Sequence, residues 1–312
     1  MGEPLSADLR SRLQQACDSV RGEFGEGKVA DYIPALAGVD ARKFGAAVVT
    51  VDGDSASYGD AQEPFSVQSI SKLFTLTLAL EKVNQDLWKR VGVEASGNAF
   101  NSILQLENEA GIPRNPFINA GALVVSDVLL EGSDSQTVIS RILTLLQSLS
   151  GDSSVYIDQE VARSEAETGF RNASLASFLK SFGNLNHEVS EVLDVYFNQC
   201  SLALSCEQLA RAALFLSNDG VDPLSDRRII SERRTRRINS IMLTCGHYDA
   251  SGEFAFRVGL PGKSGVGGGI VAIVPRRAAI AVWSPGLNSA GNSHVGTAAL
   301  EAFVHSVDWS IF

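Results

Sequence analysis

The sequence predicts an α/β fold of the α+β kind, in which an antiparallel sheet flanked by helices carries an inserted all-helical domain. Strand patterns occur only toward the two ends of the chain, and the span from about residue 66 to residue 225 consists almost entirely of helical patterns. With 312 residues, the chain is long enough for one large domain or two ordinary ones. We therefore predict a sheet domain from residues 1–65 and 226–312, a helical domain from residues 66–225, and a functional site at their junction.

The N-terminal part is expected to begin with a helix and to continue into a hairpin. Residues 5–21 carry apolar positions among charges, which is typical of a surface helix that packs one face. Residues 44–51 are apolar and end at Asp52-Gly53, a strong hairpin signal, and residues 55–58 begin the return strand. Pro34 makes the preceding stretch extended or turn-like, and by default Tyr32 is expected in the core.

Helical patterns then follow one another. Residues 69–83 have apolar side chains on overlapping faces and predict a buried helix, while the polar loop at 97–101 leads into the next helix. Asn119 opens another apolar helix. It is either a plain N-cap or an amide that faces a ligand, and the preference of Asn for N-cap positions favours the cap. Further helices are predicted within residues 134–150, 157–182, 187–203 and 205–217.

Strand patterns return toward the C-terminus. Residues 254–258 alternate between apolar and polar side chains, which favours a strand. Residues 270–274 and 278–283 flank Pro275-Arg276-Arg277 and predict an antiparallel pair, and residues 294–307 close the chain as a helix.

Composition and charge exclude several classes of protein. The net charge of −10 argues against a nucleic-acid surface, and the chain has no apolar run long enough for a membrane span. Residues 1–4 lack the basic-then-apolar order of an export signal. The scattered cysteines show no paired spacing and are expected to be reduced thiols of a cytoplasmic protein (Cys17, Cys200, Cys206 and Cys245). The four histidines lack metal-ligand spacing, so we expect no metal, and no cofactor is expected.

Ser69 and Lys72 form a Ser-x-x-Lys motif where the long apolar helix begins. Residues three apart share a helix face, so the hydroxyl and the amine can meet. A serine hydroxyl is a weak nucleophile until a base removes its proton. Lysine is such a base only when neutral, so its pKa of about 10.4 must be lowered by burial or by a neighbouring cation. The motif alone is weak evidence, because Ser177 and Lys180 form a second match and both pairs cannot be catalytic.

A second motif, Lys263-Ser264-Gly265, lies on a predicted strand. A Lys-Ser/Thr-Gly strand that follows a Ser-x-x-Lys helix is the signature pair of the penicillin-recognising serine hydrolases. An edge strand beside the serine can offer backbone N–H groups to an oxyanion, and the strand lysine adds a cation that helps keep Lys72 neutral. The glycines that follow let a substrate approach the backbone closely. The ordered pair favours an acyl-enzyme mechanism.

Longer stretches resemble the serine-dependent glutaminases over about residues 28–305. They are residues 28–34, 68–72, 115–122, 164–172, 194–201, 245–256 and 263–269. The resemblance implies a fold like that of β-lactamases and penicillin-binding proteins, hydrolysis of L-glutamine to L-glutamate and ammonia, and a homodimer or homotetramer. The net charge and the lack of a long apolar run already predict that neither nucleic acid nor membrane is a partner.

The resemblance implies a role for each matched residue. Ser69 is the nucleophile, Lys72 its base and Tyr248 a proton shuttle, while Lys263 matches the strand lysine. The backbone N–H groups of Ser69 and Val266 match an oxyanion hole. The positions that match substrate-binding residues are Tyr32, Gln68, Ser69, Asn119, Glu165, Asn172, Tyr196, Tyr248 and Val266. Glu167 lies two residues from Glu165 and could take its place in the match.

Two other functions stay open at this point. One is a β-lactam-reactive serine hydrolase of the same fold, against which the missing export signal argues. The other is a non-catalytic amino-acid-binding module, against which the presence of Ser69, Lys72, Tyr248 and Lys263 argues. A third reading, a purely structural helical protein, is disfavoured by polar loops rich in Asn, Tyr and Glu.

Overall fold

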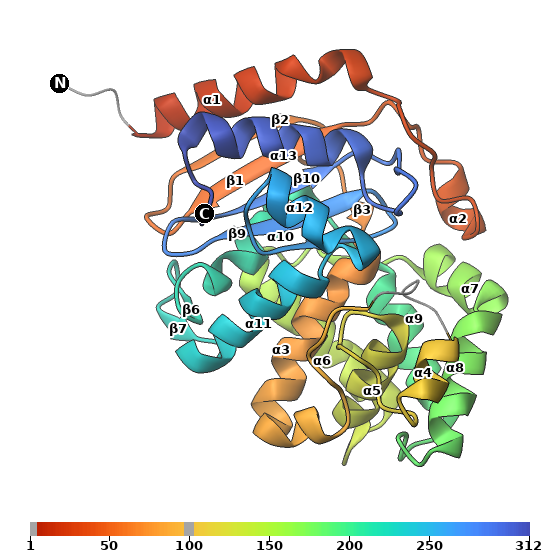
Figure 1. The fold of residues 1–312 in the computed structure, drawn as a ribbon. Coiled ribbons are helices and arrows are strands. Elements are labelled where there is room, and N and C mark those ends of the chain that lie inside the picture. The colour runs from red at the N-terminus through yellow and green to blue at the C-terminus, as the bar shows by residue number, and fades with distance from the viewer. Residues whose placement is uncertain (1–4, 97–102) are drawn as a thin grey trace.

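The computed structural model describes residues 5–96 and 103–312 and is organised around a five-stranded antiparallel sheet (Figure 1). The strand order is β2-β1-β10-β9-β8, so the hairpin from the start of the chain pairs with strands from its end. The strands are β1 (Gly45–Thr50), β2 (Ser55–Gly59), β8 (Gly262–Ser264), β9 (Gly269–Val274) and β10 (Ala278–Trp283).

Tight turns join the paired strands at both predicted hairpins. Gly53 has a φ of 93°, which glycine adopts without steric cost, and Thr50 donates from its backbone N to Asp54 O at 2.8 Å. At the second turn, Arg277 donates to Val274 O at 3.0 Å. The predicted hairpins at 44–58 and 270–283 are confirmed.

Helices cover both faces of the sheet. Helices α1 (Leu5–Ser19) and α13 (His294–Val307) lie side by side over one face, where Leu13, Val48 and Phe303 share a buried cluster. On the opposite face, α10 (Cys206–Ala213) packs against β1, β9 and β10. Burial on both faces explains why β1, β9 and β10 are almost entirely apolar and do not alternate.

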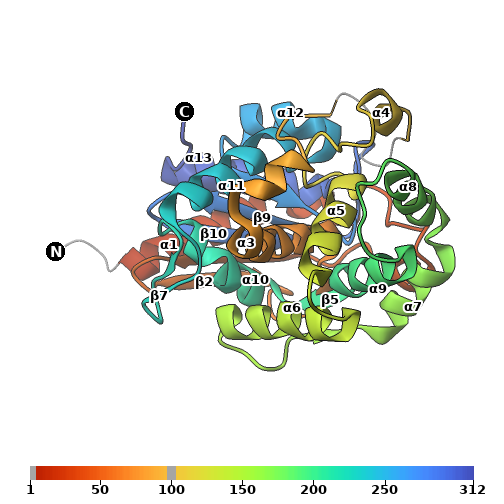
Figure 2. The ribbon, with the colours of Figure 1, turned by 90° about the horizontal axis from the view of Figure 1, so that it is seen from below.

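The helical part is built around α3 (Ser71–Val83), which packs against α5, α6, α9 and α11 in the middle of the molecule (Figure 2). Its neighbours in the chain are α4 (Ile103–Asn108), α5 (Asn119–Leu130), α6 (Ser135–Ser150), α7 (Gln159–Thr168), α8 (Phe170–Ser181) and α9 (Val189–Cys200). Helices α2 (Pro34–Ala37), α11 (Glu232–Cys245) and α12 (Ser251–Arg257) complete the set. Short 3-10 helices include η1 (Arg21–Glu23), η2 (Gln68–Ile70) and η5 (Tyr248–Ala250).

Two sequence predictions are corrected. Residues 254–258 are not a strand but lie largely in α12, and the apparent alternation is misleading because Phe254 is buried while Phe256 is 90% exposed. The span 66–225 also contributes to a small sheet of β3 (Phe65–Ser66), β5 (Leu202–Leu204) and β4 (Tyr156–Ile157) and to the pair β6 (Val221–Asp222) and β7 (Arg227–Arg228). Strands of two or three residues are too short to show a periodicity.

The division into a sheet domain and a helical domain remains a prediction. One hydrophobic cluster joins Val49 and Val271 of the sheet to Leu123 of α5, so the two parts share a core. The polar loop at 97–101 lies outside the described residues. Across residues 5–96 and 103–312, no helix combines the length and the apolar character that a bilayer crossing requires.

Candidate active site

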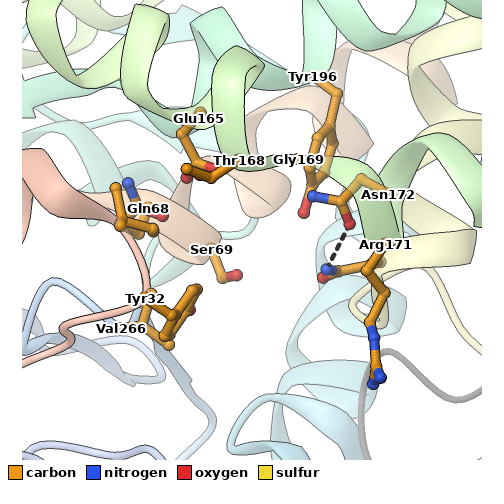
Figure 3. A pocket seen from close by; sticks show the side chains of 12 residues that line it. Tyr32, Gln68, Ser69, Glu165, Thr168, Gly169, Arg171, Asn172, Tyr196 and Val266 are labelled. Atoms are coloured by element: carbon orange, nitrogen blue, oxygen red, sulfur yellow. Dashed lines mark hydrogen bonds between the residues drawn. The ribbon is translucent and has the colours of Figure 1, made fainter.

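A cavity of about 320 Å³ opens between η2, the starts of α5 and α8, and the glycine-rich turn before β9 (Figure 3). Its volume lies in the range of small-molecule sites. It is lined by Tyr32, Ile33, Gln68, Ser69, Asn119, Glu165, Thr168, Gly169, Arg171, Asn172, Tyr196 and Val266. The structure therefore brings most of the expected substrate-binding residues into one pocket, although they come from distant parts of the chain.

Ser69 and Lys72 lie at the start of the central helix, as the motif predicts. Ser69 is in η2 with 7% of its surface exposed, and Lys72 is in the first turn of α3 with 1% exposed. Lys72 Nζ donates to Asn119 Oδ1 at 2.7 Å and to Phe117 O at 3.2 Å. Burial lowers the pKa of Lys72 to about 8, against the opposing charges of Cys200 and Glu165. A substantial fraction of the amine is therefore neutral in mildly alkaline solution, as a base requires.

The second Ser-x-x-Lys match is an ordinary surface feature. Ser177 is exposed on α8, and Lys180 Nζ donates to the backbone oxygens of Asn186 and His187. This lysine satisfies carbonyls beyond the end of its helix, which is a common role for a cation in the last helical turn.

Lys263 is completely buried on β8. Its Nζ donates to Gly246 O at 3.0 Å and to Ser264 O at 2.6 Å, and it lies 4.9 Å from the centre of the Tyr248 ring. Burial and then the charge of Lys72 hold the pKa of Lys263 well below its ordinary value. The charge of Lys72 thus acts on Lys263, whereas the lowered pKa of Lys72 itself is caused by burial, so the expected effect of the strand lysine on Lys72 stays a prediction.

Tyr248 reaches the serine from η5. Its side chain is 9% exposed, and its backbone φ is 57°. Burial raises the pKa of Tyr248 to about 12, while hydrogen bonds with Ser69 and Ser264 act in the opposite direction. The phenol is thus protonated near neutral pH and sits within reach of the proposed nucleophile.

The glycine-rich turn, residues 265–268 between β8 and β9, packs against the segment that carries Ser69. A β-carbon on Gly265 would lie 2.4 Å from Val67 O and 3.3 Å from Ser69 N, and one on Gly267 would lie 2.2 Å from Ser66 O. Only glycine permits this approach. The backbone of Val266 is thereby held next to that of Ser69, the arrangement expected of two oxyanion donors.

Glu165 is the carboxylate of the pocket. It is 7% exposed on α7, whereas Glu167 is exposed and does not line the cavity. Residues two apart on a helix point in different directions, so only one of the two glutamates can face the ligand. Burial raises the pKa of Glu165 to about 7, against a hydrogen bond with Gln68 and the charge of Lys72.

Asn119 is not an N-cap. It is the first residue of α5, accepts the hydrogen bond from Lys72, and donates from Nδ2 to Asn172 Oδ1 at 2.9 Å. The default placement of Tyr32 in the core is also wrong, because the residue is 56% exposed at the cavity. Tyr196 is buried on α9, and its ring centre lies 5.7 Å from Lys72 Nζ.

The cavity includes four residues that the sequence analysis missed: Ile33, Thr168, Gly169 and Arg171. Thr168 stands three residues after Glu165 on the same helix face, so helical spacing could have found it. Arg171 precedes Asn172 and brings an exposed cation to the rim of the pocket. Its position depends on the break between α7 and α8 at Gly169, and a single glycine within a helical pattern does not by itself show that the helix ends there.

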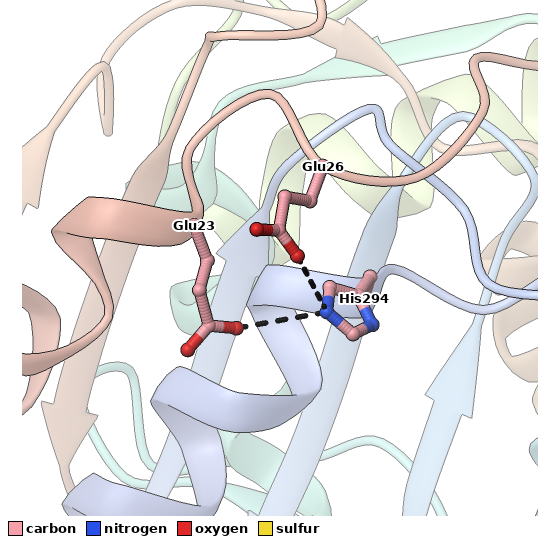
Figure 4. A group of neighbouring side chains, drawn as sticks. All are labelled: Glu23, Glu26 and His294. Atoms are coloured by element: carbon pink, nitrogen blue, oxygen red, sulfur yellow. Dashed lines mark ion pairs between the residues drawn. The ribbon is translucent and has the colours of Figure 1, made fainter.

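Among the described residues, Glu23, Glu26 and His294 form a group whose geometry could hold a metal ion (Figure 4). His294 Nε2 lies 3.6 Å from Glu23 Oε2 and 3.4 Å from Glu26 Oε2. All three side chains are 42% exposed or more, and exposed groups of this kind are common without a metal ion. Spacing did not indicate this group, because His294 is far from the glutamates in sequence.

Solved structures place the fold in a known class. The structure superimposes on a probable glutaminase, ybaS, with a TM-score of 0.91 and 38% identity, covering 97% of this chain and 98% of that one. It also superimposes on a probable glutaminase from Bacillus subtilis, solved with 6-diazo-5-oxo-L-norleucine, with a TM-score of 0.86 and 32% identity over 100% and 98% of the chains. The fold is therefore the β-lactamase-like fold of the glutaminases.

Sequence comparison gives the family. The Glutaminase family model matches residues 27–312. A thermolabile glutaminase from Rhizobium etli is 58% identical over 306 residues, which cover 98% of this chain and 99% of that protein. The chain belongs to the glutaminase family, and its function is the hydrolysis of the amide of glutamine.

Proposed function

We propose that the hydrolysis passes through an acyl-serine intermediate, with Ser69 as the nucleophile, Lys72 as its base and Tyr248 as the proton shuttle. The observation that carries this proposal is the convergence of the three groups: Ser69 lines the cavity, Lys72 is buried one helical turn away with a lowered pKa, and the Tyr248 phenol lies close enough to Ser69 for the serine to lower the pKa of the phenol. The arrangement fits the general requirement that an activated serine have a base within reach.

The proton steps balance without a cofactor. Neutral Lys72 takes the Ser69 proton, directly or through Tyr248, as Oγ bonds to the amide carbon. The same pair returns the proton to the leaving nitrogen, the carbon–nitrogen bond breaks, and ammonia departs. Water then attacks the ester by the reverse route and releases glutamate. The backbone N–H groups of Ser69 and Val266 stabilise the oxyanion in both steps.

Substrate recognition follows from the charges around the cavity. We propose that Glu165 pairs with the α-ammonium of glutamine, as a charge-assisted contact. Asn119, Asn172 and the hydroxyls of Tyr32 and Tyr196 offer neutral hydrogen-bond donors for the α-carboxylate. Gln68 acts on Glu165 by lowering the pKa of its carboxyl group, and we propose that it helps to orient that carboxylate. Lys263 is not one of the residues that line the cavity, and it supports the site through the contact of its Nζ with the Tyr248 ring.

The test is ammonia release from L-glutamine by the purified protein, alongside L-asparagine. Ser69→Ala should abolish release, and Ser177→Ala, in the second Ser-x-x-Lys match, should leave it unchanged. The glutamine analogue 6-diazo-5-oxo-L-norleucine should label the wild type once per chain at Ser69. Substantial release by a folded Ser69→Ala protein would overturn the mechanism. Hydrolysis of a chromogenic β-lactam without glutaminase activity would favour the alternative hydrolase.

We further propose a cytoplasmic protein that self-associates as a dimer or tetramer. Free, buried cysteines at all four positions support a reducing compartment. Large exposed apolar side chains on and beside α4 and α8, among them Leu104, Phe170 and Phe182, offer a surface for association. Light scattering after gel filtration tests the oligomer, and a monomer at micromolar concentration would contradict it.

A further inference from the structure

Tyr248 has an unusual backbone conformation for its size. Its φ of 57° lies in the left-handed region, which bulky side chains rarely adopt. Such a conformation persists only where the surroundings over-determine it. The contacts that hold it are therefore informative about how the phenol is placed.

Two buried side chains fix the peptide groups on either side of Tyr248. Ser251 Oγ donates to Tyr248 O at 3.0 Å and accepts from His247 N at 3.0 Å, while Asn292 Nδ2 donates to His247 O at 3.2 Å. The oxygens of His247 and Tyr248 belong to the two planar peptide units that meet at the Tyr248 Cα. Fixing both units sets the two backbone angles of Tyr248.

The two side chains are themselves well held. Ser251 is the first residue of α12 and is 4% exposed. Asn292 is 2% exposed, and its backbone pairs with Asn288 through Asn288 N to Asn292 O at 2.8 Å and Asn292 N to Asn288 Oδ1 at 3.1 Å. At such depth, water cannot readily replace a lost side-chain partner of the Tyr248 carbonyl, whereas the His247 carbonyl also accepts from Ala250 N at 3.1 Å.

The segment before Tyr248 is tied to the strand of Lys263. Gly246 O accepts from Lys263 Nζ at 3.0 Å and from Ser264 N at 3.1 Å. These bonds hold the chain up to Gly246, and the side-chain bonds from Ser251 and Asn292 act on the two peptide units that follow. The phenol oxygen is the side-chain atom farthest from the backbone, so a small rotation displaces it most.

We infer that Ser251 and Asn292 are positioning residues, which hold the Tyr248 backbone in its left-handed conformation and so place the phenol against Ser69. The inference rests on the proposed function, in which Tyr248 moves a proton. A misplacement of a catalytic group by about 1 Å can lower the rate of a reaction on the order of 100-fold. Neither Ser251 nor Asn292 lines the substrate cavity, so their loss acts on the chemical step and not on binding.

The experiment compares Ser251→Ala and Asn292→Ala with matched controls. Ser217→Ala removes another buried hydroxyl that donates to a carbonyl, that of Ala278. Asn239→Ala removes another amide that donates to a carbonyl, that of Leu216. We expect kcat to fall on the order of 10- to 100-fold in the two test variants, with little change in KM, and to stay near wild type in the controls. Ser251→Thr keeps the hydroxyl and should retain most of the rate.

A double-mutant cycle with Tyr248→Phe separates positioning from general damage. If Ser251 and Asn292 act through the phenol, their substitution costs little further activity once the phenol is gone. A loss of the same size in the Tyr248→Phe background would overturn the inference and point to misfolding. Wild-type kcat in both alanine variants, with an impaired Tyr248→Phe, would also overturn it while leaving the proposed function intact. Full activity of Tyr248→Phe would instead remove the proposed role of Tyr248.

Discussion

Lys72 and Asn119 are joined by a 2.7 Å hydrogen bond from Nζ to Oδ1. Asn119 in turn donates to Asn172, so a buried amine is connected through two amides to the wall of the substrate cavity. Any ligand that draws Asn119 away removes an acceptor that stabilises the protonated amine, and thereby favours the neutral base. We therefore expect substrate binding and activation of the proposed base to be coupled through Asn119.

The first prediction concerns pH. Because Lys72 must be neutral to act as a base and its pKa is about 8, kcat/KM should rise as pH increases toward and through this value. Ionisation of Glu165, whose pKa is about 7, should steepen the acid side of the profile. Asn119→Ala removes an acceptor from the ammonium, so it should move the Lys72 limb to lower pH. A pH series of initial rates checks this, and a profile that falls between pH 7 and 8 would refute it.

The second prediction concerns Glu165. Glu165→Gln should raise KM for glutamine about 10- to 100-fold, because a hydrogen bond to a charged group is worth roughly 1.5–3 kcal/mol. The rate at saturation should change much less. Glu167→Gln, on the exposed face of the same helix, serves as the control and should leave KM unchanged. An unaltered KM with a collapsed kcat would assign Glu165 to the proton transfers instead.

The third prediction concerns the glycine-rich turn. In Gly267→Ala, the new β-carbon would start 2.2 Å from Ser66 O, so the turn must move and carry the Val266 N–H with it. Loss of one oxyanion donor typically costs on the order of 100-fold in kcat, and we expect a loss of that order. Gly252→Ala meets no atom within 4 Å and should keep wild-type activity. Steady-state kinetics measure kcat for the two variants. Equal kcat values would contradict the prediction, because they would show that the turn accommodates the new β-carbon without moving the Val266 N–H.

The fourth prediction concerns stability. The carboxylate of Asp127 is fully buried, accepts from the backbone N–H groups of Asn186 and His187, and pairs with Arg90 at 2.6 Å. Burial pushes its pKa upward, but these hydrogen bonds prevail and hold it below its ordinary value. Asp127→Ala leaves the buried partners unpaired and should lower the free energy of unfolding by about 3–5 kcal/mol.

Urea unfolding measures this change, with the exposed Glu81→Ala as the control. The sign of the pH dependence follows from the lowered pKa. The contribution of Asp127 is present above the pKa of an unfolded aspartate and disappears as pH falls through the folded value, so wild type and variant should converge in acid. A constant difference down to strongly acidic pH would contradict this assignment.

Local sequence patterns predict much of the fold and the proximity of Ser69 and Lys72 in the site. Ser69 and Lys72 need only helical spacing to meet, and Asp52-Gly53 sets a hairpin by itself. Periodicity fails where an element is short or its faces are atypical, as for α12 with its exposed Phe256. It also gives no access to contacts between distant segments.

Contacts between segments that are far apart in the sequence complete the pocket. The default reading of Asn119 as a cap failed because tertiary partners, Lys72 and Asn172, replaced the local one. The left-handed backbone of Tyr248 depends on Ser251 and on Asn292 from another loop, and no single window of sequence contains both interactions. The pairing of His294 with Glu23 and Glu26 is likewise visible only after folding.

The strand order of the large sheet has a kinetic consequence. Gly45 pairs with Trp283 and Thr50 with Ala278, so the early hairpin finds its central neighbour only after most of the chain has left the ribosome. Until then, the inner edge of β1 is an unpaired and apolar strand, the kind of edge that promotes aggregation. Closing such distant pairs is slow, because the entropy of a long loop is lost before any contact compensates. Synthesis of this protein therefore includes a waiting period in which chaperones that shield β1 should raise the yield of folded enzyme.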